Sequence, residues 1–168
     1  MNRHAVVSIT LALIACAKQT RHEPPVPAAS SSIQAAPGDA RAKDGIRYVD
    51  SSVGTGAIAE KGKCVYTHYT GFLTDGRKFD SSHNPGPDGK PGTPIAFLLG
   101  AKQVITGWEI GFEGMRVGGK RRLFVPPALG YGPRGAGGVI PPNADLVFDV
   151  ELMGLSEPRP NRTCRPWR

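Results

Sequence analysis

The sequence of 168 residues lacks three features that would each define a class of protein. Its apolar run at residues 5–15 is shorter than the roughly 20 residues that a helix needs to cross a bilayer. Only three cysteines are present and none form a C-x-x-C pair, which argues against a zinc knuckle. We find no internal repeat and no collagen-like glycine period. The length suits one domain with tails.

The composition is unfavourable for long helices, because glycine and proline are unusually frequent. The chain has 22 glycines and 16 prolines, about twice their ordinary share, and both disfavour helix interiors. This composition excludes a helix bundle or coiled coil. All but one of the glycines and nine of the prolines lie in residues 45–155 between short apolar runs, so most are predicted to form turns of a compact fold.

A strong charge of one sign is missing from the centre of the chain. Residues 45–155 carry twelve basic and ten acidic side chains, which argues against a nucleic-acid-binding domain. The overall charge of +7 owes much to residues 156–168, with four arginines and one glutamate. We interpret this segment as a basic, disordered tail. The alternative is a surface adhesin that uses the tail to bind an anionic partner in a salt-sensitive way.

The first sixteen residues predict export. A short positive start and an apolar run end at Leu13-Ile14-Ala15-Cys16, which resembles the lipobox of bacterial lipoproteins. The resemblance implies a signal peptide at residues 1–15 and a lipid on Cys16 that anchors the protein to a membrane. We therefore expect the bacterial cell envelope, on the periplasmic or cell-surface face of the outer membrane. Ordinary cleavage after Ala17 is the alternative.

Residues 16–44 are rich in proline, alanine and serine, which predicts a tether without regular structure. Export also permits disulfides. With Cys16 lipidated, Cys64 and Cys164 remain as a candidate pair. A strand cysteine and a free tail cysteine are an equally good interpretation, because the sequence does not show whether the two can meet.

Short apolar runs in residues 45–155 predict strands around one short helix. Asp75-Gly76 favours a tight hairpin, and Trp108, Phe112 and Met115 recur at helical spacing. We expect an α+β fold in which a bent antiparallel sheet, a half-barrel, wraps around that helix. The predicted strands lie at residues 46–50, 64–73, 95–99, 120–125 and 146–152.

Two local motifs contain the residue types of known sites but lack their context. Residues 130–135 (GYGPRG) match G-x-G-x-x-G, yet flanking prolines prevent the helix that a dinucleotide site needs. Residues 80–83 (DSSH) contain hydrolase side chains, but neighbours on a strand point to opposite faces. His68 and His83 have no clear third ligand for a metal. We expect neither a cofactor nor a metal.

Half of the twelve aromatic residues lie on different predicted elements, near an end or on an inward face. They can form the core, or they can line an apolar pocket with few polar groups, which is the usual form of a ligand site. The six are Tyr69, Phe79, Phe97, Trp108, Tyr131 and Phe148.

These same segments resemble the FKBP-type peptidyl-prolyl cis-trans isomerases. The matches occur in family order across residues 45–155. The resemblance implies a pocket between helix and sheet, action on proline-containing polypeptides and binding of macrolide-type inhibitors. The matching segments are 53–56 (VGTG), 68–71 (HYTG), 75–82 (DGRKFDSS), 104–108 (VITGW), 115–118 (MRVG), 129–132 (LGYG) and 140–152 (IPPNADLVFDVEL).

By resemblance, four residues carry the catalysis. Trp108 forms the pocket floor, the Ile105 N–H binds the substrate carbonyl, and Asp80 and the Tyr131 hydroxyl lie on the rim. The implied walls are Tyr69, Phe79, Ile95, Phe97, Val104, Ile140 and Phe148. A non-catalytic peptide-binding or chaperone module with the same pocket is the alternative. We expect a monomer, because residues 17–44 cannot form the long helix through which some members dimerise.

Overall fold

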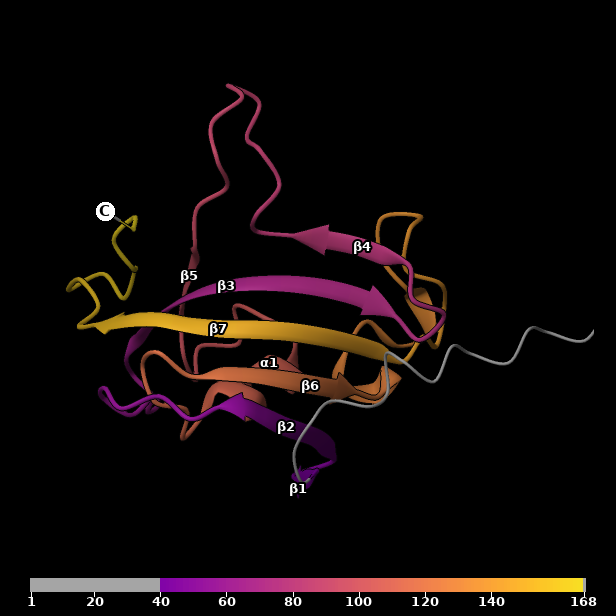
Figure 1. Cartoon of the computed structure of the whole chain (residues 1–168), viewed down its shortest axis with the longest axis horizontal. Coiled ribbons are helices and arrows are strands. Elements are labelled where there is room, and N and C mark those ends of the chain that lie inside the picture. Colours follow the sequence, from indigo (N-terminus) through magenta and orange to yellow (C-terminus); the bar gives the residue numbers. More distant parts are fainter. Residues whose placement is uncertain (1–39, 168) are drawn as a thin grey trace, which may run out of the picture.

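The computed structural model describes residues 40–167. The predicted signal peptide, Cys16 and most of the predicted tether lie outside them. Seven strands form one sheet, and a single α-helix packs on it (Figure 1). The elements are β1 (Arg41–Lys43), β2 (Ile46–Ser52), β3 (Cys64–Leu73), β4 (Lys78–Ser81), β5 (Ile95–Leu98), α1 (Thr106–Phe112), β6 (Lys120–Val125), the 3-10 turns η1 (Pro127–Leu129) and η2 (Gly132–Arg134), and β7 (Leu146–Ser156).

The strands are antiparallel throughout and follow the order β1-β2-β6-β7-β3-β4, with β5 also paired to β3. The central pair is β3 with β7, which runs from Cys64 opposite Ser156 to Leu73 opposite Leu146 with one register shift between Tyr66 and Thr67. Strands β4 and β5 share the other edge of β3, where β4 pairs with its end and β5 with its beginning. This open sheet around one helix confirms the predicted fold class.

The core lies between α1 and the inward face of the sheet. Alternate residues of β7 point to this face and are buried there together with Trp108 and Phe112 of the helix. Two helical glycines let α1 approach the sheet closely. A Cβ added at Gly107 would lie 2.5 Å from Val125 Cγ1, and one at Gly111 would lie 2.7 Å from Leu123 Cδ2. Gly107 and Gly111 have low helix propensity, but they allow α1 to pack closely against β6.

The tether was expected to run to residue 44, but the structure corrects this boundary. Residues 41–43 form β1, which pairs antiparallel with β2. The turn between them is Asp44-Gly45, with φ of 44° and 89°. Positive φ at both central residues is the geometry of a two-residue hairpin turn, which Asp-Gly favours. The folded domain therefore includes β1.

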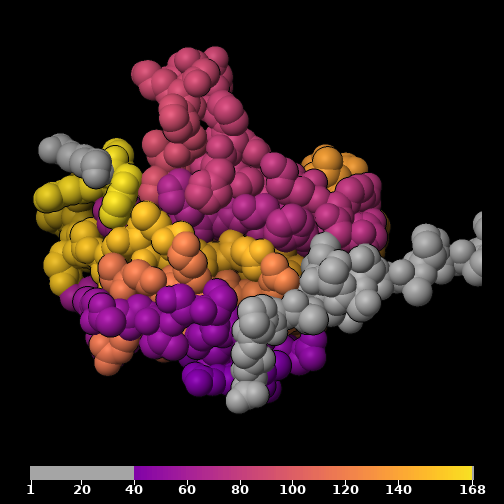
Figure 2. Space-filling model, in the orientation of Figure 1, coloured from indigo at the N-terminus to yellow at the C-terminus, as the bar shows by residue number. Residues whose placement is uncertain are grey.

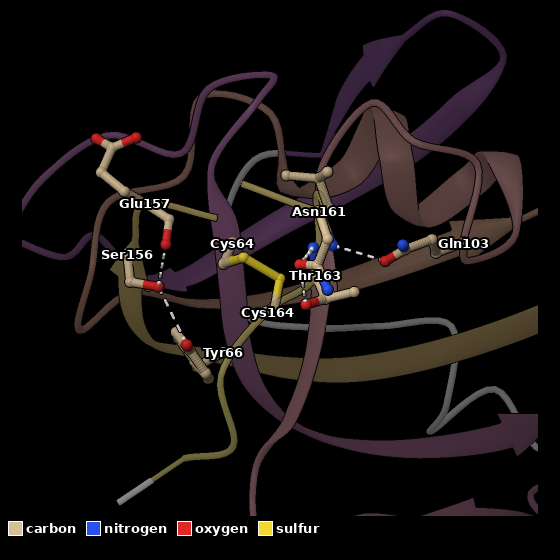
Figure 3. The surroundings of a disulfide bond; sticks show 9 residues. Cys64, Tyr66, Gln103, Ser156, Glu157, Asn161, Thr163 and Cys164 are labelled. Carbon is tan, nitrogen blue, oxygen red and sulfur yellow. Dashed lines mark hydrogen bonds between the residues drawn. A yellow bond between two sulfur atoms is a disulfide. The ribbon is translucent and has the colours of Figure 1, made fainter. Parts of the chain in front are cut away.

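The expectation of a disordered tail is wrong for residues 157–167. Cys64 and Cys164 form a disulfide with a Cα–Cα distance of 5.6 Å (Figure 3). It joins the start of β3 to the tail, and the Trp167 ring packs against Tyr66 with centroids 5.1 Å apart. The tail has no regular structure, but it is held on the domain at two places.

The predicted loop at residues 83–94 is an arm that projects from the body between β4 and β5 (Figures 1 and 2). At its base, His83 stacks on His68 with ring centroids 4.2 Å apart. Near its tip, the Gly86 N–H donates to the Lys90 carbonyl. Among the helices of residues 40–167, none is long and apolar enough to cross a membrane.

Candidate active site

A cavity of about 420 Å³ opens between α1, β3, β4, β5 and the loops that follow β5 and η1. Most of its wall is aromatic or aliphatic, and its volume suits a small apolar group. The residues that line it are Tyr69, Phe79, Asp80, Ile95, Lys102, Gln103, Val104, Ile105, Trp108, Tyr131 and Phe148.

Trp108 is the aromatic residue that α1 contributes to the wall, with 4% of its surface exposed. Tyr69 and Phe148 meet its ring nearly edge-on, at centroid distances of 5.0 and 5.3 Å. Its Nε1 is the one buried side-chain polar atom among residues 40–167 that lacks a hydrogen-bond partner. The edge-on contacts of Tyr69 and Phe148 therefore hold the indole in place, and Trp108 lines the cavity.

The polar part of the cavity centres on Asp80. Its carboxylate accepts hydrogen bonds from the Tyr69 hydroxyl and, at 2.8 Å, from the Ser81 N–H. Burial raises the pKa of Tyr69, and the hydrogen bond to Asp80 raises it further. Burial and the Asp80 charge also raise the pKa of Tyr131. Both phenols therefore stay protonated at neutral pH and can donate a hydrogen bond.

The loop between β5 and α1 carries the backbone groups of the site. The Glu109 carboxylate accepts the N–H groups of Gly100 at 2.5 Å and Lys102 at 2.8 Å, and so fixes the loop from the helix. Gln103 Oε1 accepts the Leu98 N–H at 2.9 Å. Within residues 40–167, the Ile105 N–H donates to no acceptor. The Ile105 N–H is thus one of the backbone donors beside the cavity that have no acceptor among the described residues.

Nine of the eleven predicted site residues line this one cavity, drawn from six separate parts of the chain. The two others lie outside its wall. Phe97 is buried next to Trp108, with ring centroids 6.0 Å apart, and Ile140 is buried in the same core. Lys102 and Gln103 line the cavity but were missed. Their position next to Val104 in a predicted pocket loop was the available signal.

The side chains that follow Asp80 in the segment at residues 80–83 do not join it in the cavity. Ser82 Oγ accepts the Tyr69 N–H at 2.8 Å and lies 2.9 Å from His68 Nδ1, so it braces β3 and β4 rather than facing the cavity. Burial and the neighbouring His83 lower the pKa of His68. Among residues 40–167, no group of three or more His, Cys, Asp and Glu side chains could hold a metal ion.

A comparison with known proteins agrees with this geometry. The family model of FKBP-type peptidyl-prolyl cis-trans isomerases matches residues 56–153. A protein of Neisseria meningitidis serogroup A, named FK506-binding protein, is 51% identical over 108 residues, which cover 64% of this chain and 94% of that protein.

Solved structures agree as well. FkpA from Escherichia coli has a TM-score of 0.61 at 36% identity, over 70% of this chain and 52% of that one. A peptidyl-prolyl cis-trans isomerase from Pseudomonas syringae has a TM-score of 0.62 at 34% identity, over 76% of this chain and 87% of that one. The chain therefore belongs to the family of FKBP-type peptidyl-prolyl cis-trans isomerases.

Proposed function

We propose that this isomerase accelerates X-Pro rotation in polypeptides of the bacterial cell envelope, from a lipid anchor on Cys16. The observation that carries the catalytic part is the cavity itself, an apolar chamber closed by Trp108 with the unused Ile105 N–H at its wall. The N-terminal sequence carries the anchoring part.

Rotation about an X-Pro bond crosses a barrier of about 18–20 kcal/mol because the planar amide loses resonance. A planar amide is strongly polar, and transfer of a polar group from water into an apolar site is costly. The twisted amide has lost part of its charge separation, so its transfer into the apolar site costs less free energy. A cavity of this kind therefore binds the transition state better than the ground state, as catalysis requires.

The side chains have separate roles in this proposal. Trp108 supplies the apolar surface under the prolyl ring, and the Ile105 N–H holds the substrate carbonyl. The carboxylate of Asp80, oriented by Tyr69 and Ser81, and the Tyr131 hydroxyl lie where they can orient the polar atoms around the rotating bond. A macrolide of the FK506 type should compete for the same space, in keeping with the names of the relatives.

Substituting Trp108 and Asp80 together should remove most of the prolyl isomerase activity. We expect Trp108→Ala with Asp80→Val to lower kcat/KM at least a hundredfold, because the change removes both the buried indole and the oriented carboxylate. NMR exchange spectroscopy on a short X-Pro peptide measures the rate. Asp75→Val removes an exposed carboxylate on the β3–β4 turn and serves as the control. Retained activity in a folded double variant would refute the site.

The same measurements separate the alternative function. A binding module or chaperone would hold proline peptides and suppress aggregation without changing the rate of exchange. Peptide binding by the unmodified chain with no acceleration would favour that alternative. The set of Asp80, Ile105, Trp108 and Tyr131 in one cavity favours turnover.

Export has support from outside the N-terminal segment. The Cys64–Cys164 disulfide fits an oxidising compartment, where such bonds persist. Anchoring needs more than one acyl chain to be stable, which lipidation of an N-terminal cysteine supplies.

The anchor predicts a specific mass. The mature protein from a bacterial host should begin at Cys16 and carry a diacylglycerol thioether, measured by intact-protein mass spectrometry. Cys16→Ser should abolish the added mass and move the protein from the detergent phase to the aqueous phase. A mature chain that starts at Lys18, or an unmodified Cys16, would show ordinary secretion instead.

A further inference from the structure

A second cavity lies where the tail folds back on the domain, next to the disulfide shown in Figure 3. It has a volume of about 400 Å³ and shares no lining residue with the cavity of the isomerase site. We call it the tail cleft. Its lining residues are Tyr66, Leu155, Ser156, Arg159, Arg165, Pro166 and Trp167.

The tail cleft is held in shape from both sides. The Tyr66 hydroxyl and Ser156 Oγ are hydrogen-bonded at 3.0 Å on the domain side. On the tail side, Trp167 lies so close to β7 that a Cβ at Gly154 would come 2.8 Å from its ring. A glycine inside a strand often marks such a close approach. The disulfide fixes the tail between these contacts.

The cleft combines apolar rings with unpaired positive charge. Among residues 40–167, no carboxylate forms an ion pair with Arg159, Arg162 or Arg165. Arg159 and Arg165 line the cleft, whereas Arg162 does not. Guanidinium groups bind carboxylates through paired hydrogen bonds, and Trp, Tyr and Arg are the residues that most often dominate binding energy.

We propose that the tail cleft binds an acidic segment of a polypeptide. Carboxylates of the segment pair with Arg159 and Arg165, and an apolar side chain lies against Trp167. Recognition of acidic segments by clustered arginines is a known mode of peptide binding. The charge of the tail complements such a segment, since residues 156–168 hold four arginines against one glutamate.

The shape of the cleft favours a polypeptide over a bilayer. A tryptophan that anchors a protein to a membrane places its ring at the lipid interface. Here the Trp167 ring is already packed on Tyr66 and over Gly154, with 39% of the residue exposed. Its contacts hold it as a wall of a concave site. A flat lipid surface would meet the arginines but would leave the cleft unfilled.

The tail cleft is separate from the isomerase cavity, so its occupation does not depend on the proposed function. The probe is a fluorescein-labelled nonapeptide of glutamate and leucine without proline, and its glutamine counterpart is the control peptide. Fluorescence anisotropy measures Kd for the oxidised full chain. Absence of proline keeps the probe from competing as an isomerase substrate, and normal proline-peptide exchange confirms that the protein is active.

We expect Arg159→Gln or Arg165→Gln to weaken binding about tenfold or more, because each removes a charge-assisted hydrogen bond. Arg162→Gln removes the same charge from the same tail and should change Kd less than twofold. Cys164→Ser should abolish binding by releasing the tail. The glutamine peptide should not bind.

Three results would overturn the proposal. If Arg162→Gln weakens binding of the acidic peptide as much as Arg159→Gln or Arg165→Gln, the binding is nonspecific electrostatic attraction to the tail. If Cys164→Ser binds the acidic peptide with unchanged affinity, the peptide does not bind in the tail cleft. Binding to vesicles of phosphatidylglycerol that depends on Arg159 and Arg165, without binding to the acidic peptide, would assign the arginines to a membrane surface.

Discussion

Cys164→Ser should lower the free energy of unfolding by about 4–5 kcal/mol. The crosslink spans 100 residues of sequence, so its loss restores much conformational entropy to the unfolded chain. Native disulfides typically contribute about 2–5 kcal/mol, a large part of the 5–15 kcal/mol that stabilises a domain. The substitution leaves the buried Cys64 in its small cluster with Tyr66 and Leu98, and release of the tail also removes the contact of Trp167 with Tyr66.

Urea unfolding with and without a thiol reductant measures this effect. The unmodified protein should lose stability in reductant, whereas Cys164→Ser should show the same midpoint in both conditions. If reductant leaves the unmodified protein unchanged, the bond either does not form or contributes nothing. The rest of the sheet and helix should remain folded, because their core does not include the tail.

Asp50→Ala should destabilise the domain by about 3–5 kcal/mol, because it leaves a buried guanidinium without its counter-ion. Arg121 is only 7% exposed. It donates to both Asp50 oxygens at 2.6 and 3.1 Å and to the Gly111 carbonyl at 2.7 Å. Its guanidinium also lies 4.0 Å from the centre of the Tyr48 ring. This pair ties β2 and β6 to the end of the helix.

Two further variants separate the buried charge from other causes. Adding Arg121→Met to Asp50→Ala should recover part of the lost stability, because an apolar side chain needs no counter-ion. Asp75→Ala breaks an exposed ion pair with Arg77 and should cost less than about 1 kcal/mol. Chemical denaturation gives all three values. An Asp50→Ala variant as stable as Asp75→Ala would show that water reaches Arg121.

The sequence was most informative where one local rule decides the structure. The alternation of Leu146, Phe148, Val150 and Leu152 predicted which face of β7 is buried, and the structure buries all four. The spacing of Trp108 and Phe112 predicted the helix, although α1 ends at Phe112 and Met115 follows it. Its extent depends on packing against the sheet, which periodicity does not specify.

Contacts between distant parts of the chain were harder to predict. Cys64 and Cys164 are one hundred residues apart, and nothing near either one selects the other. Without that bond, a proline- and arginine-rich tail looks disordered. The strand β1 is a different case, because Asp44-Gly45 is the same turn signal that Asp75-Gly76 provided. The predicted end of the tether at residue 44, which was based on composition, fell between the two residues of this turn.

The site was predicted residue by residue where resemblance supplied a position. Lys102 and Gln103 are polar and exposed, so neither pattern nor composition separates them from an ordinary loop. Their place in the cavity depends on two hydrogen bonds that shape the loop, one from the Lys102 N–H to Glu109 and one from the Leu98 N–H to Gln103. Phe97 was expected in the wall, but it is buried in the core next to Trp108 and does not line the cavity.

Because α1 packs closely on β6, a substitution at the contact between them can alter the shape of the cavity on the other side of the helix. Gly107 and Gly111 do not line the cavity, yet their missing side chains allow the close approach to β6 that positions Trp108. A larger residue at either position would move the indole toward the opening and make the chamber shallower. Ligand selectivity in this protein can thus be engineered, or lost, without a change in any residue that lines the cavity.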